Sequence, residues 1–125
     1  MKTEEMMKTE EIAKKLVAYC RKGEWEAAQK ELYATDVVST EPDETPAFAK
    51  ETKGLDAIIE KGHKFNSMVE KYHSIKVSEP LIAGDAFAIT LAMDLEMKGR
   101  GRTPMSEIAV YTVEEGKIVS EQFFY

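Results

Sequence analysis

Residues 86–97 read AFAITLAMDLEM, and large apolar side chains occupy every second position of this stretch. The alternation begins at Phe87 and ends at Met97, with smaller or polar residues between the apolar ones. Successive side chains of a β-strand point to opposite faces of the sheet, so this period of two predicts a long strand with one buried face. Gly84-Asp85 before the stretch and residues 98–101 after it predict tight turns.

The strand pattern continues on both sides of this stretch. Upstream, the residues from Ile75 to Glu79 alternate in front of Pro80. Downstream, a strand follows over 105–113, and a turn at 114–117 leads into a last strand that ends at Tyr125. Strands joined in order by short turns predict an antiparallel meander over the C-terminal half of the chain.

The N-terminal half has the spacing of amphipathic helices instead. Helices are expected over 9–20, with Thr9 as N-cap and Gly23 as the stop, over 25–32, and over 54–72, where Gly62 costs helix propensity and indicates close packing. Residues 36–42 predict a short strand, and residues 42–53 a loop. The expected fold class is therefore α+β, with three N-terminal helices over a strongly bent, mostly antiparallel sheet of four to six strands.

The length of 125 residues predicts a single domain over 1–125. Residues 1–6 and 7–12 are nearly the same hexapeptide, MKTEEM and MKTEEI. Either residues 1–8 are a frayed extension of the domain, or Met7 is the true start of the protein.

Composition excludes several classes of function. A net charge of −6 without a basic stripe argues against nucleic acid as a partner. No apolar run is long enough to cross a bilayer and no secretory signal is present, so we expect a cytoplasmic protein that does not bind membranes. Cys20 is the only cysteine and is expected in the core, while His63 and His73 lack a third ligand, so no metal site is predicted. Phosphate-binding loops and dinucleotide fingerprints are absent, so no cofactor is expected.

Three motifs follow one another along the chain: LYATDVVSTEP at 32–42, KGLDAI at 53–58 and GKIVSEQFFY at 116–125. Their order and spacing resemble the SnoaL-like group of the nuclear transport factor 2-like superfamily, over essentially the whole chain. The resemblance implies a cone-shaped curved sheet wrapped on the helices around one apolar pocket. It also implies a homodimer through the outer sheet face, on which we expect the small residues Ala88, Ala92, Ser106 and Ile108. It implies no single activity, because the superfamily includes isomerases, cyclases, dehydratases, hydrolases and non-catalytic modules.

The ketosteroid isomerases of this superfamily allow a residue-by-residue comparison. Glu41, just before Pro42, matches the position of their general-base aspartate. Their two oxyanion donors fall approximately on Leu16 and Ala109, whose side chains cannot donate a hydrogen bond. The resemblance therefore argues against steroid isomerisation by that mechanism.

Two further glutamates lie on strand faces that are otherwise apolar. Glu107 shares a face with Ala109 and Tyr111, and Glu121 shares one with Phe123 and Tyr125. One interpretation is that Glu41, Glu107 and Glu121 line a pocket, where desolvation and mutual repulsion raise a pKa and create a general acid or base. The other is that the strands twist, that these faces are partly wet, and that the acids pair with Lys or Arg side chains such as Arg100 or Arg102 across the sheet.

The candidate wall of the pocket consists of Met68, Tyr72, Met93, Tyr111, Phe123 and Tyr125, which suit a small hydrophobic molecule. Three functions stay open. The first is a cofactor-independent acid/base enzyme, in which a glutamate moves a proton and Tyr111 or Tyr125 orients the substrate oxygen. The second is a module that binds a ligand without changing it, and the third is a dimeric interaction domain.

Overall fold

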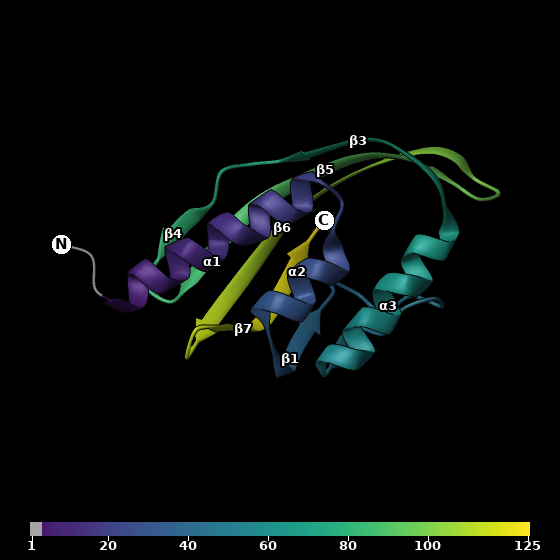
Figure 1. Cartoon of the computed structure of the whole chain (residues 1–125). Coiled ribbons are helices and arrows are strands. Elements are labelled where there is room, and N and C mark those ends of the chain that lie inside the picture. The colour runs from purple at the N-terminus through teal and green to yellow at the C-terminus, as the bar shows by residue number, and fades with distance from the viewer. Residues whose placement is uncertain (1–3) are drawn as a thin grey trace.

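The computed structural model of the protein describes residues 4–125, and their side chains from Lys8 onward. Three helices and seven strands follow in the order α1 (Glu4–Arg21), α2 (Trp25–Leu32), β1 (Tyr33–Thr40), β2 (Glu51–Lys53), α3 (Leu55–Met68), β3 (Val69–Val77), β4 (Leu81–Ala83), β5 (Ala86–Met97), β6 (Gly101–Glu114) and β7 (Lys117–Phe124). Figure 1 shows the sheet arching over the helices, which lie on its concave side.

All seven strands belong to one open sheet with the order β2-β1-β7-β6-β5-β3. Strand β4 is outside this order and pairs with the first residues of β5, whereas β3 pairs with the later ones. Every pairing is antiparallel except that of β1 with β7, which is parallel. The expected fold class of helices packed on a curved, mostly antiparallel sheet is confirmed. The expected number of four to six strands is too low, because β2 and β4 are three residues long and carry no detectable alternation.

The core lies between the helices and the concave face. All the large apolar residues of β5 from Phe87 to Met97 are buried, as their alternation predicts. The ring of Phe87 stacks on that of Tyr111 from β6, with ring centroids 4.9 Å apart. From the helix side, Leu16 and Cys20 of α1 complete the packing, and Cys20 is buried as expected. Within the described residues, no helix is both long and apolar enough to cross a membrane.

Helix α1 begins earlier than the sequence pattern predicts. It starts at Glu4, so Thr9 is not its N-cap but a fully buried residue within the helix. Of the expected N-terminal extension, residues 4–8 are helical and residues 1–3 lie outside the described residues. The helix ends at Arg21, and Gly23 terminates it as predicted. Two backbone hydrogen bonds, from Gly23 to Cys20 and from Glu24 to Tyr19, form a Schellman motif around the Gly23 φ of +70°.

Helix α3 is shorter than expected and ends at Met68, not at residue 72. Val69 and Tyr72 belong to β3, where they pair with Met97 and Leu95 of β5. The apolar spacing of this segment suits a helix as well as a strand, and pairing with the long neighbouring strand decides the outcome. Gly62 has no atom within 4 Å of the position of a Cβ, so the close packing expected there is absent.

Candidate functional site

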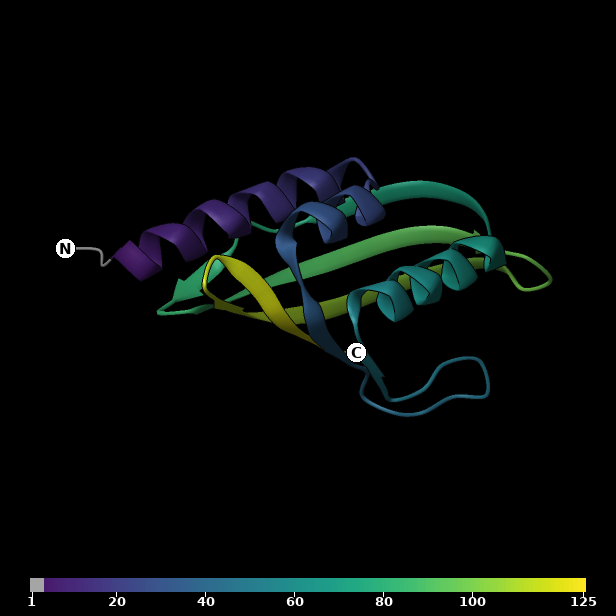
Figure 2. The ribbon, with the colours of Figure 1, turned by 60° about the horizontal axis from the view of Figure 1, so that its bottom comes forward.

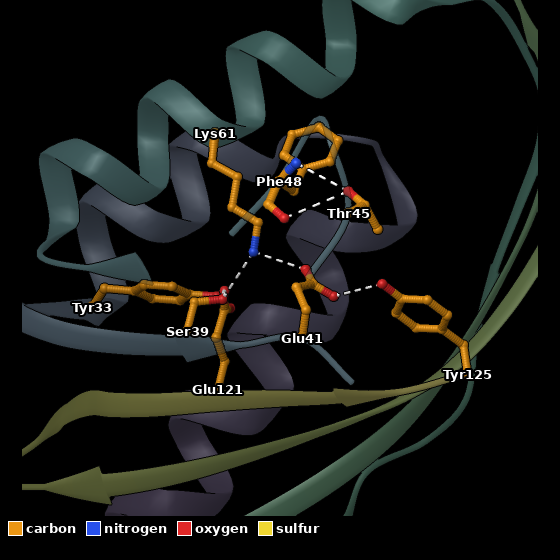
Figure 3. A network of polar contacts seen from close by, with 8 residues as sticks. All are labelled: Tyr33, Ser39, Glu41, Thr45, Phe48, Lys61, Glu121 and Tyr125. Atoms are coloured by element: carbon orange, nitrogen blue, oxygen red, sulfur yellow. Dashed lines mark hydrogen bonds and ion pairs between the residues drawn. The ribbon is translucent and has the colours of Figure 1, made fainter. Parts of the chain in front are cut away.

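Three glutamates come together where β1, β6 and β7 meet α3. Glu41 follows the last residue of β1, Glu107 lies on β6 and Glu121 lies on β7. Figure 3 shows Lys61 extending from α3 to a point between Ser39 and Glu41, with Glu121 beside Ser39. The cluster therefore joins three strands of the concave face to one covering helix.

Glu121 is the buried member of the cluster, with 5% of its surface exposed. The hydroxyl of Tyr33 donates a hydrogen bond to its Oε1, and the hydroxyl of Ser39 donates one to its Oε2 over 2.7 Å. Ser39 and Glu121 are register partners in the parallel β1–β7 pair, which explains this contact. Burial raises the pKa of the Glu121 carboxyl, and the two hydrogen bonds oppose that rise. Both oxygens of this acid are thus occupied by the protein itself.

Glu41 is held from two sides. Its Oε1 lies 2.7 Å from the Lys61 Nζ, and its Oε2 accepts a hydrogen bond of 2.9 Å from the Tyr125 hydroxyl. The side chains of Lys61 and Glu41 expose only 18% and 14% of their surface. The Lys61 ammonium also lies 3.4 Å from the Ser39 hydroxyl and 5.8 Å from the centre of the Phe123 ring. Lys61 therefore links the Glu41 pair to the Ser39–Glu121 pair.

Glu107 differs from the other two acids because its carboxyl has no hydrogen bond or ion pair within the part of the chain that the structure describes. It is partly buried on the same face of β6 as Ala109 and Tyr111, which are both buried. Burial, followed by the negative charges of Glu41 and Glu121, raises the pKa of Glu107 to about 7, against the opposing effect of the Lys61 ammonium. A carboxyl with such a pKa is available in both protonation states near neutral pH.

The alternative interpretation, in which the glutamates pair with Lys or Arg side chains, applies to Glu41, which pairs with Lys61, and is wrong for Arg102. Its guanidinium forms two hydrogen bonds of 2.8 Å with Asp94 on the neighbouring strand β5. Among the described residues, neither Arg100 nor Arg102 forms an ion pair with Glu41, Glu107 or Glu121. The cation of the cluster is a lysine from a helix, not an arginine from the sheet.

The expected wall residues lie in different surroundings. Tyr111 and Met93 are buried, Met68 and Phe123 are partly buried, and Tyr125 is 68% exposed although its hydroxyl reaches Glu41. Tyr72 donates a hydrogen bond of 2.8 Å to Asn66 at the end of α3. Tyr125 therefore contacts the cluster directly, and the Phe123 ring lies 5.8 Å from the Lys61 ammonium.

Sequence reasoning missed Lys61, Ser39 and Tyr33. Ser39 and Glu41 follow the buried Val37 at two-residue steps, and such residues share one face of a strand. The sequence therefore contains a signal for polar residues on the inner face. Lys61 is three residues after the buried Ile58 on α3, so it is a charged residue on the side that faces the sheet. Tyr33 lies between the helix expected over 25–32 and the strand expected from Asp36, so the pattern assigns it to neither element.

No group of three or more histidine, cysteine, aspartate or glutamate side chains in the described part of the chain is arranged to hold a metal ion. The three glutamates approach one another closely enough for their charges to interact, but not closely enough to act together as ligands. What the arrangement can do chemically is hold and release a proton.

Residues 7–125 match the model of the SnoaL-like domain family. The chain is 32% identical to a candidate SnoaL-like polyketide cyclase from Mesorhizobium loti, with a TM-score of 0.84 over 92% of this chain and 97% of that one. No curated protein matches the sequence.

Two more distant structures share the fold. One is an NTF2-like protein of unknown function from Burkholderia pseudomallei, at 12% identity and a TM-score of 0.79 over 94% of this chain and 90% of that one. The other is a protein with a ketosteroid isomerase-like fold from Catenulispora acidiphila, at 20% identity and a TM-score of 0.67 over 92% and 85%. At these identities the likeness concerns the fold alone.

Proposed function

The chain belongs to the SnoaL-like domain family, and from this premise we propose that it is a cofactor-independent acid/base catalyst of the isomerase, cyclase or dehydratase type, acting on a small hydrophobic molecule. The observation that carries the proposal is the state of Glu107. Its carboxyl is desolvated on an apolar strand face, stands beside two other acids, and has no partner among the described residues that would hold it in one protonation state.

The three acids have different roles in this proposal, and that of Glu41 is to position Lys61 and Tyr125. Glu107 takes a proton from a substrate carbon and returns it to another position. Glu121 is fixed by Tyr33 and Ser39, and it keeps the proton on or near Glu107 through its charge. The Lys61 ammonium has three N–H donors, and the Tyr125 hydroxyl can turn away from Glu41, so both can donate a hydrogen bond to an oxygen that becomes negative. These donors stand in for the side-chain donors that Leu16 and Ala109 cannot provide.

The proposal can be tested without knowledge of the substrate, using nitrobenzisoxazole as a probe of general bases. A carboxylate takes the proton from the ring carbon, the nitrogen–oxygen bond breaks, and a coloured cyanophenolate forms. We expect the protein to catalyse this reaction with a rate that rises with pH through an apparent pKa of about 7, because only ionised Glu107 is a base. Glu107→Gln should lower the rate by about 100-fold, at the lower end of what general bases contribute.

The matched control is Glu114→Gln, which removes an exposed acid from the end of the same strand and should leave the rate unchanged. A rate that is equal in the parent and in Glu107→Gln would refute the assignment of the base. A loss of rate in Glu41→Gln with none in Glu107→Gln would transfer the role to Glu41.

The second candidate function is a dimeric interaction module, and one observation favours it. Ile108 and Phe124 are register partners on the outer sheet face and expose 47% and 48% of their surface. Contiguous exposed apolar surface marks interaction sites, and these neighbouring side chains would be the centre of such a surface. The homodimer implied by the resemblance would use this face. We expect Phe124→Lys to shift the protein from dimer to monomer in sedimentation velocity, whereas Lys76→Gln on β3 should not; a monomeric parent would contradict this module.

A further inference from the structure

An open depression of about 340 Å³ lies between the loop that follows β1 and one side of α3. Its apolar lining includes Ala47, Phe48 and Ala57, and its charged lining consists of Glu60, Lys61 and Lys64. Such a volume lies within the range of sites for small molecules. Figure 2 shows the loop extending beside α3, away from the strands that carry Glu107 and Glu121.

The loop wall of the depression is held by its own hydrogen bonds. The backbone N–H of Phe48 donates to the Thr45 hydroxyl over 3.0 Å, and the backbone N–H of Thr45 donates to the Phe48 carbonyl over 2.9 Å, as Figure 3 shows in part. At the base of the loop, the Glu41 N–H donates to the Lys50 carbonyl over 2.7 Å. The Phe48 ring is therefore presented on a preformed wall, which lowers the entropy cost of binding.

The charge of the lining is positive, because two lysines stand against one glutamate. Glu60 lies 3.4 Å from the ring of His63, and Lys61 is already paired with Glu41. Lys64 donates to the Ala47 carbonyl and lies 5.1 Å from the centre of the Phe48 ring, but it forms no ion pair with a carboxylate of the described residues. The depression thus combines an aromatic wall with an ammonium group that lacks an anion.

We propose that this depression binds a small molecule with a flat apolar body and a single carboxylate. The body lies against Phe48 and the neighbouring alanines, and the carboxylate pairs with the Lys64 ammonium. This site goes beyond the proposed acid/base function, because none of the three glutamates of the cluster lines the depression. Lys61 is shared between the two sites, because it lines the depression and its ammonium pairs with Glu41 of the cluster.

The test compares naphthoate with naphthamide, which has the same body without the charge. We expect naphthoate to bind about fivefold more tightly in isothermal calorimetry at low salt, which is the upper range for a partly exposed ion pair. Lys64→Gln should remove this preference, and added salt should reduce it. Lys50→Gln is the matched control, because it removes a lysine from the same loop outside the depression. Naphthoate should also shift the methyl resonances of Ala47, Ala49 and Ala57.

Equal affinities for the acid and the amide would overturn the proposal, as would a loss of affinity that is the same in Lys64→Gln and Lys50→Gln. Methyl shifts confined to the concave sheet face would also overturn it, because they would place the ligand elsewhere. Glu107→Gln should bind naphthoate as the parent does. This variant therefore separates the two proposals, since it is expected to lose the proton-transfer rate and to keep the binding of the acid.

Discussion

Replacing Glu121 with alanine is expected to lower the free energy of unfolding by about 4 kcal/mol, because the change leaves the hydroxyls of Tyr33 and Ser39 buried without their acceptor. Each buried polar group that loses its partner costs about 1–3 kcal/mol, and the volume of the lost side chain adds a cavity. Urea unfolding near neutral pH measures the effect.

Two variants make this prediction specific. Glu121→Gln keeps the shape. One hydroxyl can still donate to the amide oxygen and the other can turn to accept from the amide NH2 group, so the cost should be about 1–2 kcal/mol. Glu114→Ala removes an exposed acid of the neighbouring strand and should change stability by less than about 0.5 kcal/mol. The assignment of Glu121 as an anchor fails if Glu121→Ala is no more destabilising than Glu114→Ala.

The expected cost is large because Glu121 stabilises the one parallel pairing of the described sheet, which joins strands far apart in the sequence. Strand β1 reaches β7 across most of the chain and pairs with it in parallel, with a register shift between Tyr33 and Val38. Non-local pairing must overcome the entropy of closing a long loop. A buried acid that bonds Tyr33 and Ser39 on opposite sides of that shift holds the two halves of β1 against β7.

The difference between local and non-local pairing also explains what the amino-acid sequence could predict. The period of two over 86–97 is local, so both the strand and its buried face follow from it. Strand parity also places Glu121 inward, where it is buried. The parallel β1–β7 pair has no local pattern, since hairpin turns identify only strands that are close in sequence. The start of β1 at Tyr33 was missed for this reason, and with it the contact that Tyr33 makes.

The role of Lys61 depends on tertiary structure for a different reason. A lysine near the apolar side of a helix is usually explained by its long stem, which lets the ammonium reach water. Here the ammonium instead points to the Glu41 carboxylate, over 2.7 Å. Only the placement of α3 over β1 shows that the charge is directed inward, and that placement is set by packing of residues such as Ile58.

Glu107→Gln is expected to make the protein more stable above neutral pH. The pKa of Glu107 is raised to about 7 in the folded protein from an ordinary value near 4.5, so the folded state binds this proton more tightly than the unfolded state does. The contribution of the Glu107 proton to the free energy of unfolding is therefore complete below about pH 4.5. It falls as the pH rises and is lost above about pH 7. At about 1.4 kcal/mol for each pKa unit, the loss amounts to about 2–3 kcal/mol after allowance for partial exposure.

A glutamine cannot ionise, so Glu107→Gln escapes this loss. We expect the variant to exceed the parent by about 2–3 kcal/mol near pH 8 and to match it near pH 4, with the difference opening between these values. Urea unfolding at a series of pH values measures it, and Glu114→Gln should show no such divergence. A constant difference across the series would mean that Glu107 is not desolvated. The stability difference should stop growing near the apparent pKa of the proton-transfer rate. Such agreement would show that one carboxyl, that of Glu107, causes both the loss of stability and the proton transfer, as is expected of a residue retained for catalysis at the expense of stability.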